Sequence, residues 1–326
     1  MTKQDLQKDE VENAVPPNPA VSVYMLAYQH AEYVRQAVDS VLAQKTNFPF
    51  EICLGEDESS DGTREICVKL AKEHPEKIRL FLRSRNDVIQ IAGRPTGRYN
   101  GNMTRNACRA PYVAICECDD FWIDEFKLQR QYDYLQANSS VSVCSTRGIE
   151  RTLEGKQVDN IRPDRYLPTL DHDWFLSGKT GVLTASLMYR VGSVNQNLLC
   201  DPKVLTGDWA LLLGATENGQ RCDILDNITV VYRKNGKGSW TGIDSVAKLQ
   251  AKKKTLERYL VHSQRTDLTL ANRSIAIMTL KLERVEEQKN GKLAEALFLL
   301  KQLFSRNGRS FLKEIAATRK SRKRSQ

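Results

Sequence analysis

The stretch that most constrains the fold of this chain is an apolar run that begins at Tyr112 and ends abruptly in acidic residues. Glu117, Asp119 and Asp120 follow the run, and two aromatic residues come directly after them. In an open α/β sheet, ligands bind beyond the carboxyl ends of the strands, so side chains placed there face a crevice. Glu117 and Asp119 lie two apart and point to the same side of an extended chain. We therefore predict an oxygen-rich site for Mg²⁺ or Mn²⁺, with phosphate and water as the remaining ligands.

The same acids have a structural interpretation. Acidic residues after a strand often cap the helix that follows, and Asp124 stands before residues 125–137, which have a helical pattern. The stretch by itself leaves both interpretations open.

Strand-like and helix-like segments alternate through the first half of the chain. Apolar runs of strand length occur at residues 21–25, 50–55, 78–82 and 141–144, in addition to the run from Tyr112. Helical spacing of apolar residues separates them, as in Val34, Val38 and Val41. This alternation predicts a parallel, doubly wound sheet. Residues 83–99 and 151–173 are polar and predict loops, and residues 100–108 predict a short helix.

Composition places the chain among ordinary globular proteins. Hydrophobic residues make up 40% and charged residues 27% of the 326 residues, enough to bury a core. No run of 18 apolar residues occurs, and the chain does not start with an apolar signal region, so we predict a cytoplasmic protein. The eight cysteines include no CxxC pair and are expected to be reduced thiols. Cys116 and Cys118 have too few partner ligands for a zinc site.

The net charge of +9 is concentrated at the end of the chain. Residues 291–326 contain ten Lys or Arg and two Glu, a net charge of +8, so the rest is close to neutral. This distribution indicates a basic appendage and disfavours a nucleic-acid-binding face.

Four segments, in order, resemble the family 2 glycosyltransferases, which have the GT-A fold. Residues 21–23 with Tyr28 and Gln29 resemble the opening strand of the family and its Tyr-Asn turn, and residues 56–63 resemble its Asp-Asp-Gly-Ser-Thr-Asp-Gly-Thr motif. Gly101, Arg105 and Asn106 resemble its Gly-x-x-x-Ala-Arg-Asn segment. Residues 117–122 resemble the acidic motif of the bacterial polysaccharide enzymes in the family. The matches cover roughly residues 20–137. The resemblance implies an α/β, GT-A-like doubly wound mixed sheet flanked by helices, with a C-terminal helical extension.

The resemblance also implies roles in donor binding for residues of the first half. Asp57 is expected to accept a hydrogen bond from uracil, and Tyr28 to lie against the base. Arg105 is expected to reach the nucleotide or its phosphates. Asp119 is expected to bind the metal, and Glu117 to help through the ribose or the water shell of the metal. Asp120 is a weaker candidate for this site. Asp61 is a weaker candidate for a role in donor binding, and we expect it to cap the next helix. The sequence departs from the family at Leu26 and Ala27, which stand in place of Pro-Thr at the first base contact.

Four candidate residues lie in the second half. Asp208 opens the apolar run 210–213 where the family places its catalytic carboxylate, and it serves either as base or as helix cap; Asp201 is its nearest rival. Residues 231–240 resemble the Tyr-Arg-x-His motif and glycine loop of the family, with Asn235 in place of His as a weak metal ligand. Lys237 is a candidate phosphate contact in a lid, or lies on a mobile surface loop. Residues 180–190, 222–225 and 228–231 are predicted strands.

The last third predicts helices with apolar stripes that pack onto the catalytic body or onto a second subunit. The basic residues 319–324 suit an anionic membrane surface, or form a solvated tail without a partner. We divide the chain into a flexible leader (1–19), a nucleotide-sugar-binding half (20–150), an acceptor-binding half (151–243) and a helical extension with a basic tail (244–326).

Together, these features predict a metal-dependent inverting glycosyltransferase of bacterial surface-polysaccharide type. Its expected donor is a UDP-sugar, its acceptor a glycan or lipid-linked glycan, and its cofactor Mn²⁺ or Mg²⁺. The alternatives are an inactive nucleotide-sugar-binding module, which would lack a usable carboxylate at Asp208, and an RNA-binding protein acting through the basic tail. We expect no nucleic-acid partner, because the body is near neutral and has no aromatic-basic surface motif.

Overall fold

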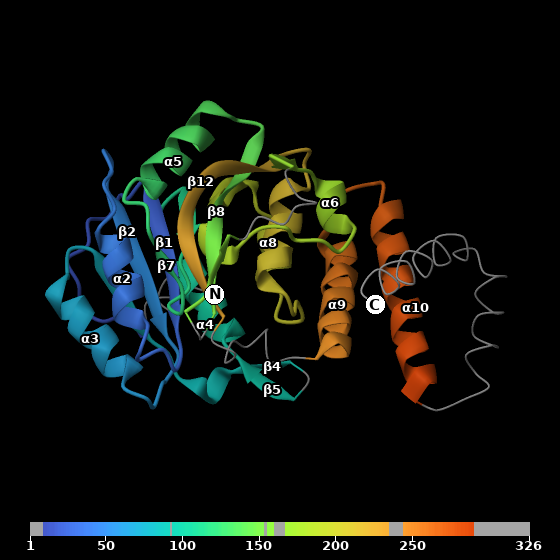
Figure 1. Ribbon diagram of the computed structural model, residues 1–326, viewed down its shortest axis with the longest axis horizontal. Coiled ribbons are helices and arrows are strands. Elements are labelled where there is room, and N and C mark those ends of the chain that lie inside the picture. Colours follow the sequence, from blue (N-terminus) through green and yellow to red (C-terminus); the bar gives the residue numbers. More distant parts are fainter. Residues whose placement is uncertain (1–8, 92, 153–154, 160–166, 235–243, 290–326) are drawn as a thin grey trace.

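The computed structural model describes residues 9–91, 93–152, 155–159, 167–234 and 244–289. A mixed sheet forms the centre of this part of the chain, in the spatial order β10-β12-β8-β11-β6-β1-β2-β3. Figure 1 shows helices on both sides of this sheet, with α9 and α10 as an outer layer beyond α8.

The first half of the sheet is parallel. Its strands are β1 (Val21–Ala27), β2 (Phe50–Glu56), β3 (Ile78–Leu82) and β6 (Tyr112–Ile115). Val21 pairs with Phe50 of β2 on one side and with Tyr112 of β6 on the other. All seven residues of β2 are buried, as expected of a parallel strand covered on both faces.

Alternating side chains of these strands face two different layers. Val21, Val23 and Met25 pack toward α2 (Val34–Leu42), α3 (Thr63–Glu73) and α5 (Lys127–Ala137). Tyr24 faces the opposite core, which contains α8 (Gly207–Thr216). The helix α4 (Arg98–Ala107) crosses β1 and β2. The two-residue period of a strand thus decides which side chains support the nucleotide half and which support the second half.

The second half adds strands of both directions. β11 (Met188–Arg190) is antiparallel to β6 and β8 (Val141–Thr152), whereas β12 (Arg221–Lys234) is parallel to β8. The remaining described elements are β7 (Phe121–Trp122), β9 (Gln157–Asp159), β10 (Thr169–Leu170), α6 (His172–Leu176), α7 (Gln196–Leu199), the hairpin β4 (Ile89–Ile91) and β5 (Arg94–Thr96), and the 3₁₀ turns η1 (Arg85–Asp87), η2 (Thr184–Ser186) and η3 (Val191–Ser193).

The helix α8 is buried on all sides. Every residue from Trp209 to Thr216 is inaccessible to solvent or nearly so, and the indole N–H of Trp209 donates to the carbonyl of Phe175 at 3.0 Å. Apolar residues around the whole circumference are typical of a helix inside a protein. Only the first residues of α8 reach the surface, so Asp208 lies at the exposed end of a rigid element.

Two long helices follow, α9 (Ser245–His262) and α10 (Thr269–Lys289). Asp244 caps α9 by accepting from the backbone N–H groups of Val246 and Ala247. Leu256 and Tyr259 of α9 and Met278 of α10 join the core that contains α8. The predicted helical extension is therefore confirmed through residue 289. The rest of the extension, with the basic tail, lies outside the described residues.

Several local predictions differ from the structure. Residues 180–190 form the turn η2 and the short strand β11 instead of one long strand, and 222–231 belong to the single strand β12. The predicted loop 83–99 contains η1, the β4–β5 hairpin and the start of α4, and the predicted loop 151–173 contains the end of β8, β9, β10 and the start of α6. Residues this polar form strands because they pair with an existing sheet edge or with each other.

Part of the predicted leader is bound to the sheet. The backbone N–H of Val11 donates to the carbonyl of Leu80, and Glu10 forms an ion pair with Arg79 at 2.6 Å. Because the edge strand β3 offers unpaired backbone groups, a polar segment docks there without apolar burial.

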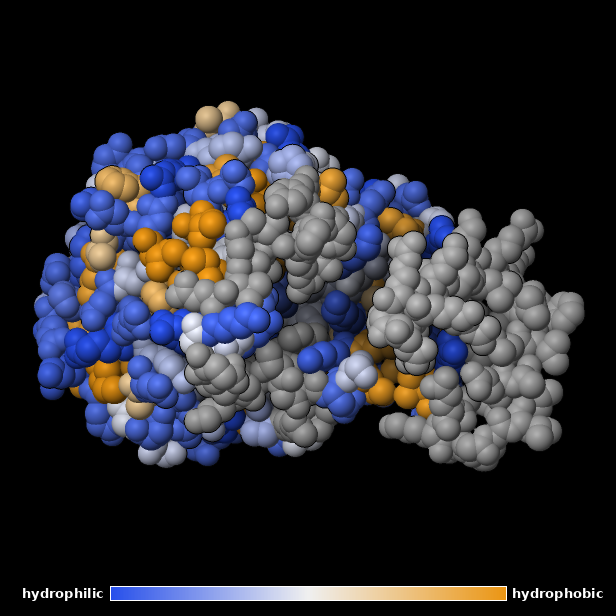
Figure 2. Space-filling model, viewed as in Figure 1, coloured by the Kyte–Doolittle hydropathy of each residue, from blue (hydrophilic) through white to orange (hydrophobic). Residues whose placement is uncertain are grey.

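The described surface on the face drawn in Figure 2 is mainly hydrophilic. Figure 2 shows apolar side chains in a few patches on one face, including one between α9 and α10. Among the described residues, no helix combines the length and apolar character needed to cross a bilayer.

Candidate active site

The acidic motif forms a tight turn directly after β6. The backbone N–H of Asp120 donates to the carbonyl of Glu117 at 2.9 Å, and the chain then enters β7. Glu117 and Asp119 are half-buried, and the side chain of Asp120 is buried. These carboxylates follow the end of β6, as predicted, but the chain turns here, so the extended geometry assumed for Glu117 and Asp119 does not hold.

Burial and mutual repulsion disfavour the charged forms of the carboxyl groups in this turn. Burial raises the pKa of Glu117 well above its usual value, and Asp119, Asp120 and Asp208 raise it further. Burial also raises the pKa of Asp120, with Asp119 adding to the effect. Asp208 lies 88 positions beyond Asp120 in the sequence, yet it is close enough to act electrostatically on Glu117.

Arg233 holds the acidic turn in place. Its backbone N–H donates to Oδ1 of Asp120 at 2.9 Å, and Nη1 donates to the carbonyl of Asp119 at 2.7 Å. Its guanidinium also lies 4.4 Å from the ring centre of Phe121. We did not predict this role, although Arg233 belongs to the Tyr-Arg motif noted in the sequence. Asn235 and Lys237, two further candidates from this motif, lie outside the described residues.

The donor set of this turn fits a hard divalent cation. Oδ2 of Asp120 is buried and has no hydrogen-bond partner among the described residues. The described residues contain no cluster of three acidic, histidine or cysteine side chains arranged to hold a metal. Mg²⁺ and Mn²⁺ commonly need only one or two protein carboxylates when substrate phosphates and water supply the rest. Asp119 and Glu117 would hold such an ion, with Asp120 beside them.

A second polar cluster lies at the end of β2. Asp57 is 3% exposed, and its Oδ2 accepts from Nη1 of Arg85 at 2.5 Å. Burial raises the pKa of Asp57, and Arg85 partly offsets this. The guanidinium of Arg85 also stacks 4.0 Å from the ring centre of Tyr28, which is 39% exposed. Asp57 and Tyr28, both predicted base contacts, are therefore joined by an arginine that the sequence analysis did not single out.

Backbone contacts fix the position of this cluster. The N–H of Asp57 donates to the carbonyl of Ala27 at 3.1 Å, which extends the β1–β2 ladder to the end of both strands. Asp61 accepts from the backbone N–H groups of Thr63 and Ala31, each at 3.1 Å. Asp61 thus serves the first turn of α3, as expected, although Gly62 occupies the cap position itself.

His30 lies near Asp119 and Asp61, close enough for both to affect its pKa, and was not predicted. Its Nδ1 is buried and finds no hydrogen-bond partner among the described residues. Burial lowers the pKa of His30, whereas the nearby carboxylates of Asp119 and Asp61 raise it. A lone histidine beside a Tyr-Gln turn gives no sequence signal for this position.

The geometry distinguishes Asp208 from its rivals. Oδ1 of Asp208 accepts from the N–H of Trp209 at 2.8 Å, its one side-chain hydrogen bond within the described part of the chain. Asp201 instead accepts from Lys203, from Arg258 at 2.6 Å and from His262 at 2.7 Å. The oxygens of Asp201 are therefore occupied by structural partners, and those of Asp208 face the surface near Glu117.

The capping alternative for Asp124 is only partly realised. The helix α5 begins at Lys127, two residues later than predicted, with Phe126 at the cap position. Asp124 accepts from the N–H of Phe126 at 3.0 Å and pairs with Arg130. Asp124 thus supports the turn before α5. Within the described part of the chain, no hydrogen bond joins the side chains of Glu117 or Asp120 to that helix.

Two arginines of α4 lie beside Tyr24 and beside the start of α8. Arg105 is packed beside Tyr24, with its guanidinium carbon 5.0 Å from the ring centre, and Nη1 donates to Asn102 at 3.3 Å. Arg98 lies against Gly207, and Asp208 acts on it electrostatically. Arg98 was not predicted, because a polar residue in a presumed loop carries no signal for burial.

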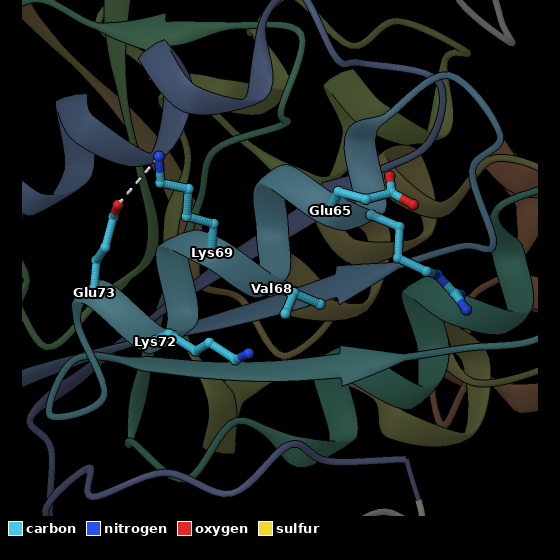
Figure 3. Close-up of a pocket in the computed structure, with 6 residues that line it drawn as sticks. Glu65, Val68, Lys69, Lys72 and Glu73 are labelled. Carbon is cyan, nitrogen blue, oxygen red and sulfur yellow. Dashed lines mark ion pairs between the residues drawn. The ribbon is translucent and has the colours of Figure 1, made fainter.

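A separate pocket lies on the outer face of α3. Figure 3 shows its lining side chains spreading from one helix, with Lys69 paired to Glu73 at 3.8 Å. None of the predicted site residues lines it. It consists of ordinary surface charges and takes no part in the site described above.

Comparisons with known proteins identify the family of this chain. The model of the family described as glycosyl transferase family 2 matches residues 22–193, more than half of the chain. Uncharacterized proteins of Mycobacterium bovis and Mycobacterium tuberculosis are 28% identical over 220 residues, covering 68% of this chain and 60% of theirs. The Escherichia coli chondroitin synthase is 29% identical over 155 residues, which is 47% of this chain and 21% of that protein. The chain therefore spans less than two thirds of the length of these relatives.

Solved structures show the same fold. S. aureus TarS, residues 1–349 in complex with UDP, aligns with a TM-score of 0.55 at 15% identity and covers 89% of this chain and 82% of that one. A mannosyltransferase of Pyrobaculum calidifontis in complex with GDP-Man and Mn²⁺ aligns with a TM-score of 0.53 at 16% identity, covering 97% and 85%. The predicted GT-A-like mixed α/β fold is confirmed by these alignments, and the predicted class of enzyme by the family match. The chain belongs to glycosyl transferase family 2.

Proposed function

We propose that this protein transfers a sugar from a UDP-sugar to a hydroxyl of a glycan or lipid-linked glycan acceptor, with Mn²⁺ or Mg²⁺ and with inversion at the anomeric carbon. The observation that carries the proposal is the exposed carboxylate of Asp208 at the start of the buried helix α8, close enough to act electrostatically on Glu117 in the acidic turn after β6. The base and the metal site that we propose would thus share one reaction centre.

The donor would occupy the crevice between β1, β2 and the acidic turn. Asp57 and Tyr28 would contact the uracil, beside the backbone of Ala27. Arg85 pairs with Asp57 and stacks on Tyr28. When a base binds, Arg85 would therefore either move away from the Asp57 carboxylate or share that carboxylate with the base. Lys237 and Arg105 remain candidates for the phosphates. Support for a nucleotide donor comes from the structures of fold relatives that contain UDP or GDP-Man.

The reaction would be a single displacement. Asp208 would accept the proton of the acceptor hydroxyl as it attacks the anomeric carbon, because one of its oxygens is not used by the N–H of Trp209. Asp119 and Glu117 would hold the divalent ion, which when bound supplies neutralising charge at the leaving diphosphate. Direct attack from the face opposite the leaving group needs no protein nucleophile and inverts the configuration.

Cell-surface polysaccharide synthesis is the context that we propose. The chondroitin synthase of E. coli and the hyaluronan synthase of Pasteurella multocida are among the relatives, the latter 30% identical over 174 residues. A cytoplasmic enzyme at the inner face of the membrane, held there by the basic tail, would suit a lipid-linked acceptor. Packing of the C-terminal helices against a second subunit is a further proposal.

Donor-dependent thermal stabilisation tests the central assignment. A panel of nucleotide sugars with Mn²⁺ should raise the melting temperature for the true donor, because a ligand that binds only the folded state stabilises it. We expect Asp119→Asn to lose the metal-linked part of this shift. Asp208→Asn should keep the shift and lose transfer, and Asp133→Asn, an exposed carboxylate on α5, should change neither. Equal donor responses in wild type and Asp119→Asn would refute the metal assignment.

The alternatives predict different results. An inactive sugar-nucleotide-binding module would show the donor shift without transfer in the wild type. An RNA-binding protein would show a salt-sensitive shift of RNA mobility. If that shift survives deletion of the basic tail, the body of the protein binds the RNA.

A further inference from the structure

Arg98 is a half-buried cation, and two of its nitrogen atoms are buried donors without a partner in the described part of the chain. Its Nε and Nη2 atoms are inaccessible to solvent and find no hydrogen-bond partner among the described residues. A guanidinium has five N–H donors in a fixed fork, and buried polar groups are nearly always satisfied. Unsatisfied donors on a charged side chain point to a missing ligand.

The surroundings position this fork beside the proposed base. A Cβ atom on Gly207 would collide with Nη1 of Arg98, so the absence of a side chain at Gly207 lets the guanidinium lie against the first residue of α8. The next residue is Asp208, which acts electrostatically on Arg98. No hydrogen bond joins the two side chains in the described structure, so Asp208 does not satisfy the fork.

A second cation makes the unpaired state of Arg98 less favourable. Burial lowers the pKa of Arg98 to about 10, and the positive charge of Arg105 lowers it as well. The guanidinium is still charged at neutral pH. Two arginines that repel each other in a desolvated place leave a local excess of positive charge, which Asp208 offsets only in part.

The packing against α8 indicates which substrate faces this fork. Nη1 of Arg98 lies against Gly207, the residue directly before Asp208. The fork therefore lies beside the start of α8, where the acceptor hydroxyl would be deprotonated in the proposed function.

We propose that Arg98 binds an anionic group, a carboxylate or a phosphate, carried by the acceptor close to the hydroxyl that Asp208 deprotonates. This inference rests on the proposed function, because it takes Asp208 as the base. The guanidinium fork matches both anions with two parallel hydrogen bonds. Arg98 is then a specificity residue that selects acidic acceptors, such as uronic-acid-containing or phosphate-containing glycans, over neutral ones.

Binding of small anionic probes tests this assignment. The full chain, saturated with UDP and Mg²⁺, is titrated calorimetrically with D-glucuronate, glycerol phosphate and, as a neutral control, D-glucose at constant ionic strength. The wild type should bind at least one anion and not glucose, and the better of the two anions identifies the source of the charge. Arg98→Met should weaken that anion by at least about tenfold, and Arg98→Lys, which keeps the charge without the fork, should bind with intermediate affinity.

Further measurements separate binding from structure. Arg98→Met should bind UDP like the wild type and melt at the same or a higher temperature, because it removes unsatisfied buried donors. Arg35→Met, which removes an exposed arginine paired with Glu73 on the surface, should retain wild-type anion binding.

Several outcomes would overturn the inference. For anion binding, they are an Arg98→Met variant that binds the anion as tightly as the wild type, an Arg35→Met variant that loses as much anion affinity as Arg98→Met, or a wild type that binds neither anion. For the Arg98→Met variant itself, they are a lower melting temperature than that of the wild type or a loss of UDP affinity. The loss of UDP affinity would assign Arg98 to the donor. Failure of the wild type to bind UDP with Mg²⁺ is a different result, since it would refute the proposed function itself.

Discussion

The stability of this protein should fall steeply between pH 7 and pH 5 because of one buried histidine. His172 of α6 is 5% exposed, and its ring nitrogens contact Oγ1 of Thr216 at 3.0 Å and the hydroxyl of Tyr259 at 2.9 Å. These contacts join α6, α8 and α9. Burial lowers the pKa of His172 from its ordinary 6.5 to about 4. Of the surrounding charges, Arg265 lowers the pKa further, and Glu217, Asp173 and Asp171 raise it.

The sign and size of the effect follow from this shift. Below pH 6.5 the unfolded chain takes up a proton at His172 that the folded protein refuses, so stability is lost as the pH falls toward 4. The full loss is about 3 kcal/mol, since each pKa unit corresponds to about 1.4 kcal/mol. Between pH 7 and pH 5, the linkage relation gives a loss of about 2 kcal/mol from this residue.

Urea unfolding at both pH values measures the loss. His172→Gln keeps a hydrogen-bonding side chain but cannot titrate, so its free energy of unfolding should fall by about 2 kcal/mol less than that of the wild type over this range. His74→Gln, at the end of α3, controls for the removal of a histidine as such and should behave as the wild type. An identical pH dependence in wild type and His172→Gln would show that the imidazole titrates normally and that its burial does not matter.

Two further substitutions test the donor site and the core separately. Asp57→Ala should weaken UDP binding by ~10–150-fold in calorimetry, because it removes a charged hydrogen-bond acceptor from the base site; unchanged affinity would place the uracil elsewhere. Glu51→Ala should lower the free energy of unfolding in urea by about 3–5 kcal/mol, because Glu51 is fully buried and pairs with Arg109, whose Nε lies 2.8 Å away. Glu51→Gln should recover part of this loss, and equal stability of wild type and Glu51→Ala would show that the pair contributes nothing.

The nucleotide half was predictable because its strands carry a strong local signal. Parallel strands covered on both faces appear as short, nearly continuous apolar runs, and β1, β2 and β3 begin where the sequence analysis placed them. The acidic turn could be located for the same reason, since ligand-binding side chains follow the end of a strand. The last residue of each strand was less predictable, because pairing with neighbours extends β8 to Thr152, well beyond its apolar start.

The remainder depends on contacts between distant segments. The strand β11 exists because it fills the space between β6 and β8, and nothing in residues 180–190 shows that only the last three would pair. Arg85 and Arg98 were missed for a related reason. Both lie in a polar stretch whose composition predicts an exposed loop, and their burial is produced by partners far away in the sequence, Tyr28 in one case and Gly207 in the other.

The contrast between Asp201 and Asp208 shows what the structure adds to a motif. Both are aspartates near the start of α8, and the sequence supplied no physical ground for excluding either. Asp201 is held by Arg258 and His262 of α9, so its charge is already neutralised and its removal would loosen the contact between α9 and the loop before α8. Asp208 stands on a helix whose other residues are fixed by burial, so its backbone is rigid while its carboxylate is exposed. A group that must take a proton from a substrate needs that combination of a fixed position and an unoccupied oxygen. Stability and catalysis therefore divide between two chemically identical side chains according to the partners that the fold gives each of them.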